Sequence, residues 1–308
     1  MTNLLEAESG PLKDALSTDP TGTLYHYTTQ AGLLGIIETG EIWATHTQYL
    51  NDAREYRHAV SLVTAELAKD LKGAHGDRRR ILEDMSEGIK GIESTNVCVC
   101  SFSEDRDSLS QWRAYGGQSS GYAIGFDPVH LAQMAKLERG HLVRCLYDSS
   151  EKTVVVRALI EGVCEQNLER LQAGETLFED RDEWLHAEKR LWPRGGEFGV
   201  YLHHLAPILK HKSFSAEREW RIILPPLPCT RERFAFRSGK STLTPYYRVP
   251  LSLPDRPLKL SEIVVGPTPH IKQSISAVKN FLTRWNYITN DSIETVPVNR
   301  SAVPYRNW

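Results

Sequence analysis

The chain has 308 residues, is 40% hydrophobic and 25% charged, and carries a formal net charge of −2. This balance is typical of a globular protein and argues against bulk nucleic acid as the main partner, which usually requires a basic excess. The five cysteines show no CxxC spacing, so a disulfide framework or zinc site is poorly supported. Because no apolar run approaches the ~20 residues of a membrane helix, we expect a soluble cytoplasmic protein without metal or membrane partner.

The elements follow from apolar periodicity and from turn and cap residues. Residues 1–20 are polar and are expected to form a loose arm or short helix. After them we expect, in chain order, a strand at 24–28, a helix at 30–39, a strand at 42–44, helices from 51 to about 92 with a turn near 73–76, a strand at 97–103, a short helix at 108–115, a strand at 121–126, a helix from 128, a strand at 141–147, helices over 151–210 with breaks near Gly174 and Pro193, strands at 218–224, 247–251 and 263–265, and a helix at 271–285.

Three of the helix ends have specific signals. Gly40 follows the helix at 30–39 at the position where a left-handed residue ends a helix. Asp52 and Glu55 have the spacing of a capping box, and Asp127-Pro128 combines a cap with a proline at the first helical position. Because strands and helices do not alternate regularly, a doubly wound sheet is unexpected. The sequence predicts one α+β domain over residues 21–308, with 151–210 as a helical insertion that packs beside the sheet without its own core.

The first motif that could carry chemistry is Tyr25-His26-Tyr27-Thr28. On a strand His26 and Thr28 share one face, and the tyrosines share the other. An imidazole and a hydroxyl on one face could hold a ribose hydroxyl, although a half-exposed strand with a hydrogen-bonded histidine gives the same pattern.

The second motif is the alternating strand at 97–103. Its face with Val97 and Val99 ends in Ser101 and Ser103, two small hydroxyl residues that would let a ligand approach the backbone closely. A strand that turns polar as it leaves the core is the simpler alternative.

The third motif is Phe214 to Arg221. On an extended strand Glu217, Glu219 and Arg221 would share one face, and two carboxylates so placed repel unless something uses them. One carboxylate could engage a nucleophile while the other steadies a cationic intermediate. An exposed edge strand with alternating charges is an equally good interpretation.

Together with Asn51-Asp52-x-x-Glu55, Gln111-Trp112-x-x-Tyr115 and Val303-Pro304-Tyr305-Arg306, these motifs resemble those of a large bacterial family of unassigned function, over about residues 23–306. The order of an H-x-T strand, an S-x-S strand and an E-x-E strand also resembles the ADP-ribosyltransferase superfamily. That resemblance implies a mixed or antiparallel split sheet with helical insertions. It also implies NAD as a consumed substrate and a macromolecular acceptor, protein or nucleic acid, with defence or a toxin as a biological context.

The resemblance assigns a role to each candidate residue. His26 and Thr28 would hold NAD, Ser101 and Ser103 would line the nicotinamide pocket, and Trp112 or Tyr115 would stack on nicotinamide. Glu219 would stabilise the oxocarbenium-like transition state, so Glu219→Gln should abolish turnover with the fold intact. Glu217 would contact the acceptor. Phe214, Asn51 and Arg221 complete the expected substrate-binding set, and His26, Thr28, Ser101 and Glu219 are expected to line one cleft.

Three other functions remain open. An NAD glycohydrolase would differ only in using water as the acceptor. A non-enzymatic RNA- or protein-sensing domain could use the same cleft. A metal-assisted nuclease would need clustered ligands such as His26, Asp52 and the glutamates, but the only adjacent histidines, His203 and His204, diverge on a helix.

Overall fold

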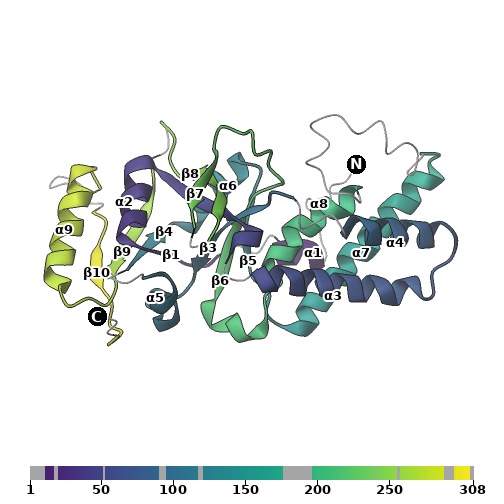
Figure 1. Ribbon diagram of the computed structural model, residues 1–308, viewed down its shortest axis with the longest axis horizontal. Helices are drawn as coiled ribbons and strands as arrows, with labels where there is room; N and C mark the ends of the chain where they lie inside the picture. The colour runs from purple at the N-terminus through teal and green to yellow at the C-terminus, as the bar shows by residue number, and fades with distance from the viewer. Residues whose placement is uncertain are drawn as a thin grey trace.

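The computed structural model describes residues 11–16, 20–50, 53–89, 95–116, 121–175, 196–239, 241–254, 257–287 and 295–305 (Figure 1). Its elements, in chain order, are α1 (Pro11–Leu16), β1 (Leu24–Thr28), α2 (Gln30–Thr39), β2 (Glu41–His46), the 3₁₀ helix η2 (Thr47–Tyr49), α3 (Ala53–Leu71), α4 (Gly76–Ile89), β3 (Cys98–Ser103), α5 (Leu109–Tyr115), β4 (Tyr122–Phe126), α6 (Pro128–Leu137), β5 (His141–Arg144), α7 (Ser149–Gln172), α8 (Gly196–Leu205), the 3₁₀ helices η5 (Ala206–Ile208) and η6 (Lys212–Glu217), β6 (Glu219–Ile223), β7 (Phe234–Ser238), β8 (Leu243–Pro250), β9 (Leu260–Val265), α9 (Ile271–Arg284) and β10 (Val298–Arg300).

The described strands form one mixed, open, ten-stranded sheet in which the pairing of β9 with β10 is parallel and the other strand pairings are antiparallel. Its central strand is β3. Along one edge β3 pairs with β6 over five residues, and β6 continues to β5. Along the other edge β3 meets β2 near its start, at Cys98 and Val99, and β1 at its end, at Ser103. The sheet therefore splits at β3 into a β1-β4-β9-β10 wing and a β2-β8-β7 wing.

Apolar residues cover both faces of the sheet. One face packs on α2, α6 and α9 through the alternate residues of β3, Cys98, Cys100 and Phe102. On the opposite face Val99, Val143 and Ile223 pack on the helices α1, α3, α4, α7 and α8, which Figure 1 shows gathered at one end of the molecule. Farther along this face, Tyr25 and Tyr27 pack on Trp112 of α5 and on the C-terminal segment. The alternation predicted for β3 is confirmed.

The helices α7 and α8 lie largely in the segment 151–210 that is expected to be a helical insertion. The described helices α7 and α8 share one core with α3, α4 and the sheet, and this core includes Leu67, Leu82, Val156 and Leu202. They therefore form part of a helical layer that residues 53–89 complete. The expected break near Pro193 and the cap at Asp52 lie outside the described residues.

Most of the expected elements are present, and their ends follow the predicted signals. Gly40 ends α2 in the left-handed conformation with φ 64°, and Asp127 accepts a hydrogen bond from the Val129 amide at the start of α6. Two strands, β7 and β10, were missed. Both are short and lie at edges of the sheet.

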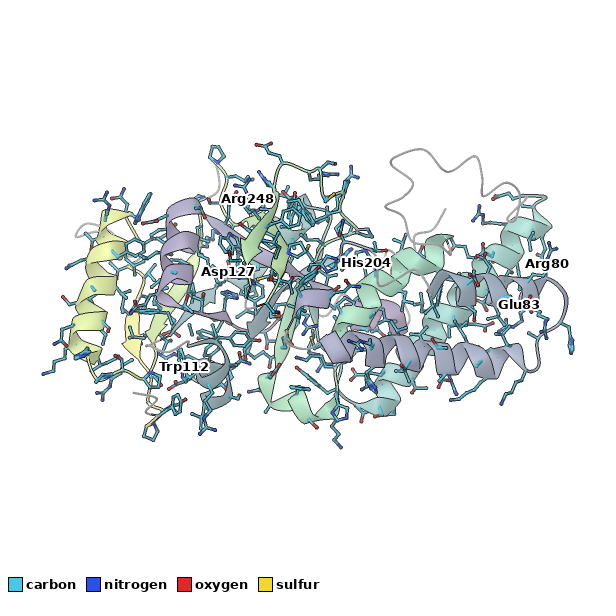
Figure 2. The ribbon with its side chains drawn as sticks, in the orientation of Figure 1. Arg80, Glu83, Trp112, Asp127, His204 and Arg248 are labelled. Atoms are coloured by element: carbon cyan, nitrogen blue, oxygen red, sulfur yellow. The ribbon has the colours of Figure 1, made fainter. Side chains whose placement is uncertain are left out.

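Two adjacent histidines of α8, His203 and His204, are buried, and Figure 2 shows His204 where the helices meet the sheet. His203 is 0% exposed and His204 is 4% exposed. Within the described part of the chain, neither ring nitrogen of His203 has a hydrogen-bond partner. Burial lowers the pKa of each imidazole to about 3, because a low-dielectric core disfavours the charged form. Both rings are therefore neutral in the folded protein at neutral pH.

The lowered pKa values of these two histidines predict that the folded protein loses stability in acid. Below about pH 6.5 the unfolded chain binds protons that the folded chain excludes until about pH 3. The free energy of unfolding should therefore fall across that window, by up to about 1.4 kcal/mol per pH unit for each histidine. Urea unfolding at pH 7.5 and 5.5 measures the slope. The variant His203→Leu should reduce this dependence of the free energy of unfolding on pH. His75→Leu, at an exposed histidine, is the control and should leave the dependence unchanged. The same slope in His203→Leu as in wild type would contradict the prediction.

Candidate functional site

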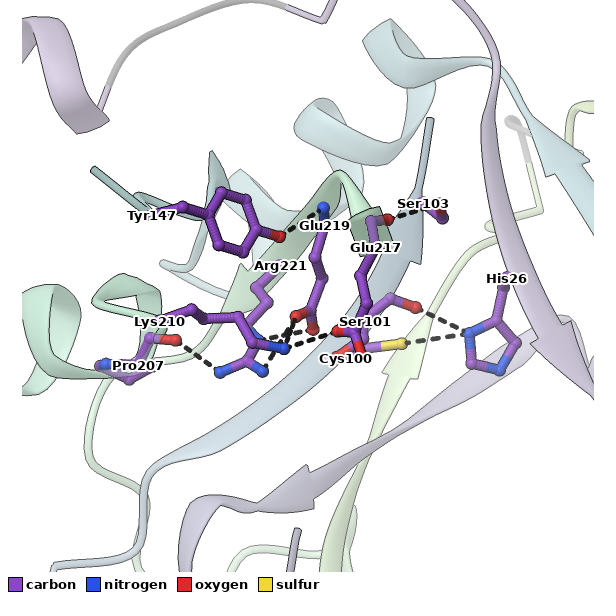
Figure 3. Close-up of polar contacts among 10 residues, drawn as sticks. All are labelled: His26, Cys100, Ser101, Ser103, Tyr147, Pro207, Lys210, Glu217, Glu219 and Arg221. Carbon is purple, nitrogen blue, oxygen red and sulfur yellow. Dashed lines mark hydrogen bonds and ion pairs between the residues drawn. The ribbon is translucent and has the colours of Figure 1, made fainter. Parts of the chain in front are cut away.

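The three sequence motifs lie on strands that are neighbours in the sheet (Figure 3). Tyr25 of β1 is directly opposite Ser103 of β3, and Ser103 is directly opposite Glu219 of β6. Two residues along, Ser101 is opposite Arg221. The fold thus brings the H-x-T, S-x-S and E-x-E segments together although β1 and β6 are far apart in sequence.

His26 lies at the point where the sheet splits. Its Nδ1 is 2.9 Å from the Ser101 carbonyl oxygen, in the stretch of β3 between its pairings with β1 and β2. Burial lowers the pKa of His26, opposed in part by this hydrogen bond, so the ring is neutral at pH 7. Because a carbonyl can only accept, the proton must reside on Nδ1, and Nε2 keeps a lone pair that can accept from a ligand hydroxyl.

The expectation that His26, Thr28, Ser101 and Glu219 point into one cleft is wrong in its geometry. Residues directly opposite each other share a face, so Tyr25, Ser103 and Glu219 point to one side. His26 and Thr28 alternate with the tyrosines and point to the other side. The His26 ring accordingly packs near Phe102, at 5.8 Å between centroids. Figure 3 shows His26 and the glutamates on opposite sides of Ser101.

The other polar residues of β1 and β3 are held by the fold. The Ser103 hydroxyl is buried, donates to the Glu217 carbonyl at 2.7 Å and accepts from the Asp105 amide at 3.0 Å. Thr28 packs so closely on α2 that any side chain at Gly32 would collide with its hydroxyl. Ser101 and Thr28 each remain partly exposed.

Glu219 is the centre of a buried cluster of charges. Its Oε1 accepts from Arg221 Nε at 2.7 Å, and its Oε2 accepts from Lys210 Nζ at 2.6 Å and Arg221 Nη2 at 3.1 Å. Burial alone would raise the pKa of Glu219, but the charges of Arg221 and Lys210 outweigh it and lower the pKa to about 2. The carboxylate is 5% exposed and stays ionised throughout the neutral range.

Glu217 does not lie on the strand as predicted. Arg218 adopts a left-handed conformation with φ 45°, so β6 begins at Glu219 and Glu217 ends the 3₁₀ helix η6. The two carboxylates still meet, because Lys210 Nζ also donates to Glu217 Oε2 at 2.7 Å. The side chain of Glu217 is 22% exposed, which makes it the member of the pair that reaches solvent.

The remaining residues predicted to bind NAD or the acceptor differ in how far they are exposed. Trp112 is 2% exposed, packs edge-on against Tyr27 and donates to Asp107, so it belongs to the core. Tyr115, on the same short helix, is 38% exposed. The Phe214 ring lies 5.1 Å from Lys210 Nζ. Asn51 lies outside the described residues.

Arg221, predicted to bind substrate, is buried and bonded to Glu219 and to the Pro207 carbonyl. Its guanidinium is therefore occupied by the protein itself.

Sequence reasoning missed the basic and phenolic partners of the glutamates. Lys210 is 1% exposed, Lys152 donates to the Lys210 carbonyl at 2.8 Å, and the Tyr147 hydroxyl accepts from the Glu219 amide at 2.9 Å. The one available signal was a lysine that directly follows the apolar run from Leu205 to Leu209. Lysines are rarely buried, so this signal by itself favoured a solvated position.

Among the described residues no group of three or more histidine, cysteine, aspartate or glutamate side chains could hold a metal ion. No helix in the described ranges is both long and apolar enough to cross a membrane.

Part of the chain matches a known family model. Residues 111–222 match the model of a family described as "Protein of unknown function (DUF2971)". The matched segment runs from α5 to β6 and includes Lys210, Glu217 and Glu219, but not His26 or Ser101. No curated protein matches the chain, and no solved structure does.

The buried charge cluster revises the expectation that Glu219→Gln leaves the fold intact. The amide cannot balance Arg221 and Lys210, and breaking a buried ion pair costs about 3–5 kcal/mol. We expect chemical denaturation to show a loss of that size. Glu161→Gln is the control, because its half-exposed pair with Arg78 contributes at most about 1 kcal/mol. Equal stabilities of Glu219→Gln and wild type would show that the cluster contributes nothing to folding.

Proposed function

We propose that the chain is an NAD-consuming ADP-ribosyltransferase whose site lies along β3, between β1 and β6. The observation that supports the proposal is the adjacency of the three motif-bearing strands, in the arrangement that the resemblance implies. A pair of carboxylates at the end of β3, of which Glu217 reaches solvent, adds the negative charge that such chemistry needs.

The reaction breaks the bond between ribose C1′ and the nicotinamide nitrogen, and the electron pair leaves with nicotinamide. The C1′ centre becomes cationic until an acceptor oxygen or nitrogen attacks it and loses a proton. A carboxylate beside C1′ lowers the energy of this transition state. Glu217 fits that role better than Glu219, because Glu219 is buried and both of its oxygens are bonded by cations.

Polar and aromatic side chains could supply binding groups. Ser101 is partly exposed on the same sheet face as Glu219, and Phe214 and Tyr115 offer aromatic surface for nicotinamide or for the acceptor. His26 points to the other face of the sheet, so it lies outside this proposed set of binding groups. Water in place of the acceptor would make the same site an NAD glycohydrolase.

One observation favours a second candidate. The pairing of Glu219 with Lys210 and Arg221 is what a purely structural ion cluster would show. A non-enzymatic domain that recognises RNA or protein would keep this cluster for folding alone, and binding by such a domain would tolerate Glu217→Gln.

Incubation with NAD labelled in the ADP-ribose, with and without cell lysate, tests the proposal. Wild type should consume NAD and label a macromolecule. Glu217→Gln should lower kcat by about 10²-fold or more while the melting temperature changes little, because the amide keeps the shape but loses the charge. The matched control Glu161→Gln should leave kcat unchanged.

Each negative result has a distinct meaning. Lack of NAD consumption by folded wild-type protein would reject the transferase and favour the recognition domain. Consumption without labelled macromolecules would identify a glycohydrolase. Wild-type turnover in Glu217→Gln would remove that residue from the mechanism.

A further inference from the structure

Lys210 is fixed at both its backbone and its side chain. Its amide donates to the carbonyls of Leu146 and Ile208, each at 3.0 Å, and its own carbonyl accepts from Lys152 Nζ at 2.8 Å. The Lys210 side chain is 1% exposed, so its ammonium group has little freedom to move. These contacts tie the lysine to the strand end after β5, to η5 and to α7.

The ammonium group joins the two glutamates of the site. It lies 2.7 Å from Glu217 Oε2 and 2.6 Å from Glu219 Oε2, above the ring of Phe214. Burial is the largest single effect on Lys210 and lowers its pKa, but the nearby negative charges, with Glu219 first among them, together outweigh it and raise the pKa overall. The lysine therefore stays protonated and can donate to both carboxylates at once.

The two carboxylates differ in how else they are held. Glu219 is also fixed by Arg221, and its amide is bonded to Tyr147. Glu217 lies at the end of η6, next to the left-handed Arg218, and its side chain is the more exposed of the two. A buried cation that is anchored on one side and bonded to Glu217 on the other can define where the exposed carboxylate points.

We propose that Lys210 is a positioning residue that holds Glu217 in the orientation required for ADP-ribosyl transfer, using Glu219 as its fixed counter-charge. The inference rests on the proposed function and adds to it a residue that acts through Glu217 without touching NAD. Without the ammonium group, Glu217 and Glu219 would repel each other and the exposed carboxylate would swing away from C1′.

A double-mutant cycle of Lys210→Met and Glu217→Gln tests this role. Each single variant should lower kcat for NAD consumption by about 10²-fold. The kcat of the double variant should be no lower than that of the less active single variant. The KM for NAD should change by less than about threefold in each, because positioning acts on the transition state. Losses that multiply, to about 10⁴-fold in the double variant, would overturn the proposal.

Stability is separated from positioning by a matched control. Lys69→Met removes another lysine bonded to a buried glutamate, Glu66, at 2.6 Å on α3. It should lower the melting temperature without changing kcat. If Lys210→Met does not fold, the cycle is run with Lys210→Gln, which keeps a hydrogen-bond donor, and the same non-additivity is expected.

The outcomes also separate the two proposals. Multiplying losses in an active wild type would reject the role of Lys210 and leave the transferase standing. A folded wild type without NAD turnover would reject both, since there would be no reaction for Lys210 to support.

Discussion

The strand β3 pairs with three other strands, and the rest of the fold depends on this constraint. One edge is used fully by β6, and the other is divided between β2 and β1. Two strands cannot continue side by side from the same edge, so the sheet opens into two wings. The backbone carbonyl of Ser101 faces this opening, and the imidazole of His26 donates to it as a neighbouring strand would have done.

The same strand brings the polar and apolar parts of the molecule together. On one face Val99 and Ile223 belong to the core shared with the helical layer, and two residues farther along Ser101 and Arg221 face the charge cluster. Four ionised groups, Lys210, Arg221, Glu217 and Glu219, then balance one another without net charge. Such a cluster can lie at the edge of a core because each charge has an opposite partner within hydrogen-bond distance.

Glu217 and Glu219 have different environments, although the E-x-E pattern makes them look alike. Spacing of two residues suggests equivalent carboxylates on one strand face. The left-handed Arg218 breaks the strand between them, so Glu219 enters the core while Glu217 stays at the surface. The buried carboxylate of Glu219 is held by Lys210 and Arg221, and the carboxylate of Glu217 is the one that solvent reaches.

The sequence by itself determined the elements whose signals are local. The 3.6-residue period and Gly40 specify α2, Asp127-Pro128 specifies the start of α6, and alternation specifies the two faces of β3. It also indicated that Glu217 and Glu219 would repel each other unless something uses them.

Only the tertiary structure decided which groups neutralise the two carboxylates and where each motif points. Lys210 reaches the glutamates because β5, η5 and α7 fix its backbone, and no spacing in the sequence encodes that contact. The face on which His26 lies depends on its register with β3 and β4, and a shift of one residue would reverse it. Contacts of this kind are set by long-range pairing, which local propensity does not determine.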